Sequence, residues 1–241
     1  MGEQGPGSVA RWPFAPGGRV EILLATVPVL AGLLGILLWP GPPSLLVFLL
    51  LGLLWGLVLF FFRDPERLSP AEGDAVLSPA DGRVLFVGEV DEPRFVKGRA
   101  RRVGVFLSLL DVHVNRSPVS GTVELVEHRP GAFHQAFRPE ASEHNEHNLL
   151  GIVREDDRIL VRQIAGILAR RVVCTARPGD HVKAGERFGL IKFGSRVETY
   201  FPLHYEVCVR PQDRVLGGVT ILAARARAPD AGRSERQGGA R

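Results

Sequence analysis

The sequence has little cysteine, few aromatic residues and almost no excess of charge of either sign. Its 241 residues include 2 cysteines, Cys174 and Cys208, which lie far apart and in no CxxC spacing. They form neither a disulfide framework nor a thiolate metal site, which fits a reducing compartment. The net charge of +4 and the 7% of aromatic residues argue against a nucleic-acid partner, because such proteins carry basic patches or base-stacking side chains.

The apolar residues are concentrated near the N-terminus. Residues 22–39 (ILLATVPVLAGLLGILLW) and 45–62 (LLVFLLLGLLWGLVLFFF) contain no charged side chain. Each run has about 18 residues, just enough for a helix to cross the hydrocarbon of a bilayer. A helix in a soluble core is rarely apolar on every face over such a length. The two runs therefore predict a pair of membrane helices.

The connection WPGPPS is short and rich in helix breakers, so we expect a tight helical hairpin over residues 19–63. A secretory signal is the alternative for the first run, but no small-residue cleavage site follows it. A shallow re-entrant hairpin is the alternative to a full crossing, because Pro28 interrupts the first run. Basic residues flank the pair and none lies in the connection, which places residues 1–18 and the rest of the chain on the cytoplasmic face of the cell membrane. These basic residues are Arg11, Arg19, Arg63 and Arg67.

Beyond the hairpin the pattern changes to short alternating apolar runs separated by Gly, Pro and Asp, which is typical of β-strands. The predicted strands are residues 84–87, 103–107, 122–126, 159–164 and 205–209. A short helix over residues 165–174 is the one helical competitor. The sequence thus predicts a mainly β domain over residues 64–224. A disordered basic tail over residues 225–241 follows, either solvated or in contact with anionic lipid.

Glycine-rich turns recur within this β domain. Residues 178–189 follow the pattern PGDxVxxGExxG, and the theme SPxxGxV occurs at residues 78–84 and again at residues 117–123. Together they resemble the barrel-sandwich hybrid fold of lipoyl and biotinyl carriers. Those carriers attach a prosthetic group to a lysine at a hairpin tip, and neither SPxxGxV turn contains a lysine. The resemblance implies the fold and not the carrier function.

The Gly194–Ser195 pair follows these motifs in the segment FGSRVETYFP. From this pair alone an ordinary turn is the safer interpretation, and no G-x-S-x-G nucleophile elbow is present. The pair also suits one intramolecular reaction, in which the serine hydroxyl attacks the preceding carbonyl and converts the amide into an ester. Elimination and hydrolysis then leave a pyruvoyl group, a carbonyl that binds amines and accepts electrons.

Four motifs in this order resemble the phosphatidylserine decarboxylase family, in its short bacterial and archaeal form. They are SPADGRV at residues 78–84, FLSLLDVHVNRSPVSG at 106–121, ASEHNEHN at 141–148 and FGSRVETYFP at 193–202. The similarity extends from Asp64 to about Ala224. It implies a self-processing, pyruvoyl-dependent lyase that converts phosphatidylserine to phosphatidylethanolamine and CO2.

The resemblance implies roles for the matching residues. Ser195 is the nucleophile of maturation and then the pyruvoyl residue that forms a Schiff base with the substrate. Cleavage between Gly194 and Ser195 gives a heterodimer of a large chain, 1–194, and a small chain, 195–241. His113 takes the Ser195 proton, oriented by Asp81, and later protonates the decarboxylated carbon.

One position departs from the family pattern. Longer relatives carry a second histidine three residues after the first, whereas this chain has Arg116 there. The division of labour between maturation and decarboxylation is therefore open. Without the family, Asp81–Gly82 is an ordinary turn pair and His113 an ordinary strand histidine.

Other polar residues are candidates for the substrate head group. Asn145 and Asn148 suit hydrogen bonds to it, and Arg116 and Arg138 suit its phosphate or carboxylate. The histidines and glutamates of residues 143–147 superficially resemble metal ligands, but no further ligand has suitable spacing. A pyruvoyl enzyme needs no metal, so no metal site is expected.

Two other classes of function stay open. A membrane-anchored adaptor or transport module would use the lipoyl-like fold for binding. A serine hydrolase acting on lipid esters would use Ser195, His113 and Asp81 as a triad. Self-cleavage at Ser195 separates both from a decarboxylase.

Overall fold

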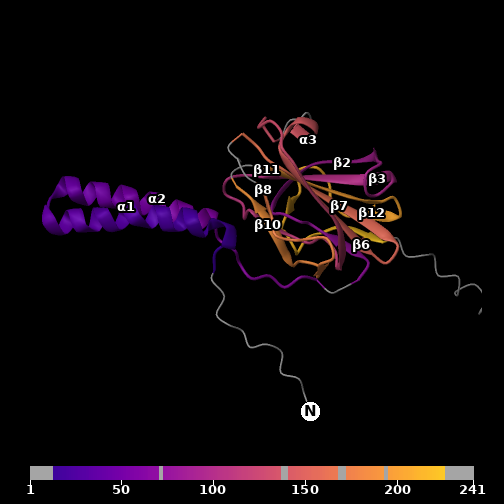
Figure 1. Ribbon diagram of the computed structural model, residues 1–241, viewed down its shortest axis with the longest axis horizontal. Coiled ribbons are helices and arrows are strands. Elements are labelled where there is room, and N and C mark those ends of the chain that lie inside the picture. The colour runs from indigo at the N-terminus through magenta and orange to yellow at the C-terminus, as the bar shows by residue number, and fades with distance from the viewer. Residues whose placement is uncertain (1–12, 71–72, 137–140, 168–171, 193–194, 226–241) are drawn as a thin grey trace, which may run out of the picture.

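The computed structural model describes residues 13–70, 73–136, 141–167, 172–192 and 195–225. In this part the chain forms two long helices that project side by side from a β domain (Figure 1). The helices are α1 (Arg19–Leu38) and α2 (Pro42–Phe61), with a 3-10 turn at Pro16–Gly18 ahead of α1 and a one-turn helix α3 (Ala141–His144) within the β domain. The predicted mainly β class with a preceding helical hairpin is confirmed.

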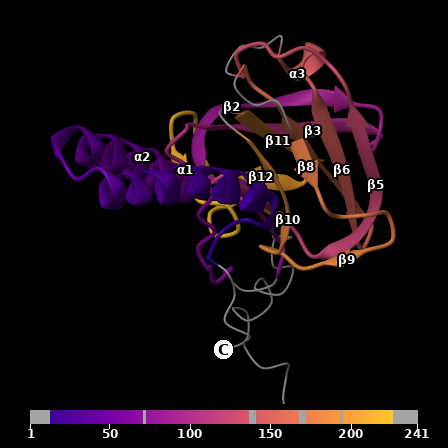
Figure 2. The same ribbon diagram turned by 60° about the vertical axis from the view of Figure 1, so that its left-hand side comes forward.

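The β domain contains a large curled sheet and two small ones, which Figure 2 shows from a second side. The described strands are β1 (Ala75–Leu77), β2 (Gly82–Glu92), β3 (Gly98–Leu107), β4 (Val114–Arg116), β5 (Gly121–Arg129), β6 (His147–Arg154), β7 (Asp157–Ile164), β8 (Val172–Cys174), β9 (His181–Val182), β10 (Arg187–Ile191), β11 (Ser195–Pro202), β12 (Tyr205–Val207), β13 (Arg214–Val215) and β14 (Ile221–Arg225). The eight-stranded sheet has the order β13-β2-β3-β11-β7-β6-β5-β9, and the small sheets are β1-β14-β12 and β4-β10-β8.

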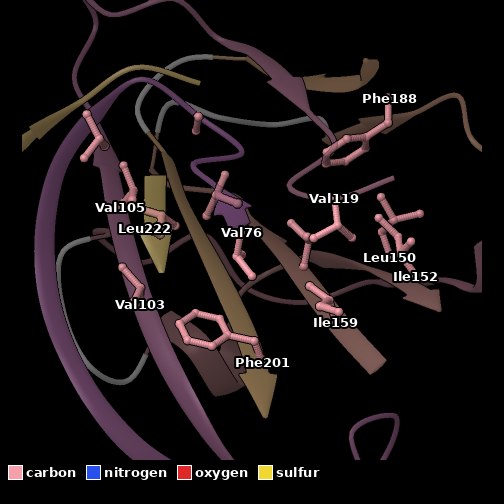
Figure 3. Packing of buried hydrophobic residues seen from close by; sticks show 14 of the residues in the cluster. Val76, Val103, Val105, Val119, Leu150, Ile152, Ile159, Phe188, Phe201 and Leu222 are labelled. Carbon is pink, nitrogen blue, oxygen red and sulfur yellow. The ribbon is translucent and has the colours of Figure 1, made fainter. Parts of the chain in front are cut away.

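Alternate side chains of the curled sheet point inward and form the main core. Val103 and Val105 of β3 and Phe201 of β11 are 0% exposed and pack in one cluster with Ile159 of β7 (Figure 3). Such two-residue alternation is what the predicted strand pattern required. The sheet curls around this core, and β11 lies between β3 and β7 within it.

Apart from Arg19 and Glu21 in the first turn of α1, the hairpin helices carry no charged side chain, and they are mostly exposed. Each has 20 residues, which corresponds to about 30 Å and matches the hydrocarbon thickness of a bilayer. Pro28 lies inside α1 without ending it, and Pro42 and Pro43 begin α2. Both helices are long and apolar enough to span a membrane. Between them, the Trp55 indole N–H donates to Thr26 Oγ1 at 3.0 Å.

The base of the hairpin is attached to the β domain. Phe61 and Phe62 pack with Leu190 of β10 in a small apolar cluster. Backbone hydrogen bonds of 2.8–2.9 Å join the two ends of the hairpin to each other, from Ala15 N to Phe62 O and from Asp64 N to Pro13 O. The hairpin is therefore fixed to the domain beside β10, a few residues before β11 begins.

Two local expectations were wrong. Residues 172–174 form strand β8 rather than the end of a helix, because β10 provides a pairing partner that the local sequence does not reveal. Arg225 is the last residue of β14 and pairs with Tyr205, so the predicted tail began one residue too early. Residues 226–241 lie outside the described part of the chain.

Candidate active site

Ser195 is the first residue of β11 and is completely buried. It lies opposite Leu107 of β3, and the next residue lies opposite Ile164 of β7. Its exposed fraction is 0%, and its Oγ has no hydrogen-bond partner among the described residues. Gly194, the other half of the predicted cleavage site, lies outside those residues. An unpaired buried hydroxyl is uncommon and calls for a functional or structural reason.

His113 lies beside the strand that leads to Ser195. Its carbonyl accepts a hydrogen bond from Ile191 N at 3.3 Å. Its Nδ1–H donates to the carbonyl of Asp111 at 2.9 Å, which leaves the Nε2 lone pair free to accept a proton. That Nε2 is buried and has no partner in the described part of the chain.

The environment of His113 keeps the imidazole neutral. The side chain is 2% exposed, and its ring stacks on Phe61 at the end of α2. Burial lowers the pKa of His113 from 6.5 to about 4, against the opposing hydrogen bond to Asp111. A neutral imidazole at pH 7 is able to act as a general base.

Asp81 is buried close to this region but does not bond to His113. Its carboxylate forms a two-pronged ion pair with Arg67, at 2.5 and 2.8 Å, and accepts a hydrogen bond from Gly217 N at 2.8 Å. The carbonyl of Asp111, and not Asp81, accepts the hydrogen bond of the His113 Nδ1–H, and the orienting role of Asp81 stays a prediction. Asp81 acts on His113 through its charge, which raises the His113 pKa slightly against the larger effect of burial.

Arg116 is committed to structural contacts. Its guanidinium donates to Asp64 at 3.1 Å and to the carbonyls of Pro65 and Gly185 at 2.8 and 3.1 Å. Arg187 binds the same carboxylate. Arg116 thus ties β4 to the segment that leaves the hairpin, and its role in substrate binding stays a prediction. Arg138, the other arginine predicted to bind substrate, lies outside the described residues.

The two asparagines predicted to bind the head group are also engaged internally. Asn145 accepts from His134 N at 2.9 Å and donates to the carbonyls of His134 and Ala165 at 2.8 and 2.7 Å. These bonds use both of its amide hydrogens. Asn148 donates to Gln163 Oε1 at 3.1 Å and is 3% exposed. Both side chains therefore order the site's surroundings, and neither is turned toward open solvent.

A buried polar row near Ser195 was missed by the sequence analysis. Gln163 joins Asn148 to Asn115 and donates to Asn115 Oδ1 at 2.7 Å. Gln163 lies opposite Val197 of β11, so it points to the same face of the sheet as Ser195. Asn115 Nδ2 has no partner within the described part of the chain. The only sequence signal was a glutamine that follows the apolar Ile159 and Val161 on the same face of the strand.

A charged cluster occupies the opposite face of β11. Arg196 and Glu198 are both 0% exposed and lie 3.0 Å apart. Ser142 of α3 donates to Glu198 at 2.7 Å, and Tyr200 donates to it at 2.5 Å. Burial raises the pKa of Tyr200. The cluster fixes the ASEH segment against the strand that carries Ser195.

The histidines of residues 143–147 do not form a metal-binding group. Among the described residues, no three His, Cys, Asp or Glu side chains converge as metal ligands would. His147 Nδ1 instead bonds to the carbonyl of Asn145 at 2.8 Å, and burial lowers its pKa.

Comparison with known proteins identifies the family of the chain. The family model of phosphatidylserine decarboxylase matches residues 54–223. The chain is 53% identical over 166 residues to the phosphatidylserine decarboxylase proenzyme of Symbiobacterium thermophilum, covering 68% of this chain and 77% of that protein. It is 46% identical over 202 residues to the proenzyme of Carboxydothermus hydrogenoformans, covering 83% and 91%. For the proenzyme of Salinibacter ruber the identity is 44% over 200 residues, covering 82% and 86%.

These matches place the protein among the carboxy-lyases, the enzymes that release CO2 by breaking a carbon–carbon bond. Within that class, the chain belongs to the phosphatidylserine decarboxylase family. The similarity extends beyond the β domain into the second hairpin helix.

Proposed function

We propose that this protein converts phosphatidylserine to phosphatidylethanolamine and CO2 after cleaving itself between Gly194 and Ser195. The observation that carries the proposal is the buried Ser195 Oγ, which has no partner among the described residues. Leaving such a group unpaired costs about 1–3 kcal/mol, and a reactive role accounts for that cost. The relatives' designation as proenzymes supports processing of the chain.

His113 supplies the base for maturation. Its Nε2 takes the Oγ proton as Ser195 attacks the Gly194 carbonyl carbon, and the Ser195 nitrogen receives that proton as the amide bond breaks. Loss of the Ser195 Cα proton then expels the Gly194 carboxylate and leaves dehydroalanine. Water hydrolyses the dehydroalanine and releases ammonia. The products are the large chain, 1–194, and the small chain, 195–241, which begins with a pyruvoyl group.

The residues present fit such a group. Position 195 is fully buried, and the adjoining strand positions are the apolar Leu107 and Ile164. When formed, the group supplies a ketone that condenses with the substrate amine and accepts the electron pair left by CO2. The chain's own residues exclude water, which favours loss of the carboxylate charge. His113, neutral at rest, takes up at Nε2 the one proton that decarboxylation consumes and passes it to the substrate carbon.

The hairpin anchors this site in the cell membrane. The lengths and the apolar surface of α1 and α2 support a full crossing. The arginines at both ends of the pair support a cytoplasmic β domain, because positive residues stay on that side. A substrate with two acyl chains is then presented to Ser195 without leaving the bilayer.

A serine hydrolase is disfavoured by the partners of Asp81. A triad needs its carboxylate on the histidine Nδ1, and here Asp81 binds Arg67 and Gly217 while Nδ1 binds the Asp111 carbonyl.

Denaturing electrophoresis and mass spectrometry of the full chain in phospholipid nanodiscs test the proposal. We expect wild type and Ser69→Ala to split into chains 1–194 and 195–241, with a small chain that lacks a free α-amine. Ser195→Ala should stay whole and release no CO2 from phosphatidylserine. A wild-type chain that decarboxylates while intact would overturn the pyruvoyl mechanism. A cleaved chain that releases no CO2 would overturn the proposal that phosphatidylserine is the substrate.

A further inference from the structure

An exposed apolar turn lies between β3 and β4. Asp111 N donates to Ser108 O at 3.0 Å, and the Asp111 carboxylate accepts from Ser108 N and Oγ at 2.8 and 2.6 Å. The two central residues of the turn are Leu109 and Leu110, which are 47% and 69% exposed. Polar residues and glycine usually fill such positions. Outside the helices, this is the one adjacent pair of exposed large apolar side chains among the described residues.

This turn is attached to the base of the membrane hairpin. Arg63, which follows the end of α2, donates to the carbonyls of Phe60 and Leu110, each at 2.6 Å. Val112, just beyond the turn, packs with Ala15 ahead of α1. The turn therefore lies level with the helix ends, where a bilayer surface would begin.

A second exposed apolar side chain lies on the other side of Ser195. Since β11 is antiparallel to both β3 and β7, these two strands end where β11 begins. The Leu109–Leu110 turn follows β3, and Ile167, 51% exposed, comes three residues after β7. The two apolar tips thus flank the start of β11, where Ser195 is buried.

Basic side chains accompany the tips. Arg19 begins α1, Arg63 holds Leu110, and Arg214 binds Asp111 at 2.8 Å while staying 66% exposed. Each such residue is attracted to an anionic membrane surface. Isolated exposed leucines are ordinary, but apolar tips beside arginines at a helix end are typical of interfacial membrane contacts.

We infer that the Leu109–Leu110 turn and Ile167 insert into the surface of the anionic bilayer that holds the hairpin, one on each side of the Ser195 site. The site then opens toward the lipid head groups between them. The inference depends on the hairpin lying in a membrane and not on decarboxylation, so the two are tested separately.

Fluorescence quenching measures the insertion. The full chain, with Cys174 and Cys208 replaced by Ser, carries one environment-sensitive dye at Leu110→Cys or Ile167→Cys. The control is Arg99→Cys, near the opposite end of β3, where the side chain is 69% exposed. The nanodiscs contain phosphatidylcholine and phosphatidylglycerol, with and without a spin-labelled acyl chain.

We expect blue-shifted, strongly quenched emission at positions 110 and 167, consistent with a depth of about 5–10 Å, and none at position 99. Water-like emission at positions 110 and 167 would overturn the inference, as would insertion at only one of them. Blue-shifted emission that needs a second copy of the chain, and that spin-labelled lipid does not quench, would also overturn it in favour of a contact between copies.

Discussion

The imidazole of His113 stacks on the phenyl ring of Phe61, with ring centroids 4.1 Å apart and an angle of 35° between the ring planes. Phe61 is the last residue of α2, so a residue of the apolar hairpin covers the proposed base. The hairpin therefore contributes to the burial that lowers the His113 pKa to about 4. The contact between Phe61 and His113 thus links the membrane anchor to the proposed base.

His113 makes the stability of the fold depend on pH within a defined window. Its pKa is about 4 in the folded chain against an ordinary 6.5, so between these values the unfolded chain binds a proton that the folded chain excludes. This contribution is complete above pH 6.5 and is lost as the pH falls to 4, by about 3 kcal/mol. We expect the Tm in nanodiscs to fall as the pH is lowered from 6.5 to 4, and to fall less in His113→Gln. An equal dependence of Tm on pH in wild type and His113→Gln would contradict the lowered pKa of His113.

Replacing Phe61 should change the pH profile of maturation. Phe61→Ala removes the ring over His113 and admits water, so the His113 pKa rises toward 6.5. The acid limb of the cleavage rate, expected near pH 4 in wild type, should move up by at least one unit. Leu57→Ala, at a position of α2 that is 56% exposed, serves as the control and should leave the profile in place. Cleavage in buffers of graded pH, followed by electrophoresis, measures this, and an unchanged limb in Phe61→Ala would refute the role of the ring.

The Arg67–Asp81 pair should behave as one unit. Both side chains are about nine-tenths buried, so removing one charge leaves the other unpaired at a cost of about 3–5 kcal/mol. We expect Arg67→Met and Asp81→Asn each to lower the free energy of unfolding by that order, and the double variant to lose less than their sum. A double-mutant cycle measures the coupling. Additive losses would show that the ion pair contributes nothing beyond its separate side chains.

Asn145 should act on stability rather than on substrate affinity. Asn145→Ala removes the three hydrogen bonds to His134 and Ala165. It leaves the Ala165 carbonyl buried and unpaired, at a cost of about 1–3 kcal/mol, and the partly buried groups of His134 add less. We expect a lower Tm with the KM for phosphatidylserine within about twofold of wild type. A raised KM at an unchanged Tm would instead restore Asn145 as a head-group ligand.

Much of the architecture was predictable because it depends on local pattern. The uncharged runs at residues 22–39 and 45–62 predicted α1 and α2, and two-residue alternation predicted the β domain. Strand β8 was missed because three residues carry too little periodicity, and its pairing with β10 determines its conformation. The motifs nominated Ser195, His113 and Asp81, whose catalytic roles stay predictions.

The sequence by itself determined the apolar hairpin, the strand pattern and the family, since each is written in neighbouring residues. Only the tertiary structure decided the partners: Arg67 on Asp81, Asp64 on Arg116, and Phe61 on His113. Each pair joins segments that are distant in the chain and meet only when the sheet has curled and the hairpin has docked. Whether a charged or polar group is paired depends on which group lies within about 3 Å of it in the folded chain, and no local sequence pattern specifies that.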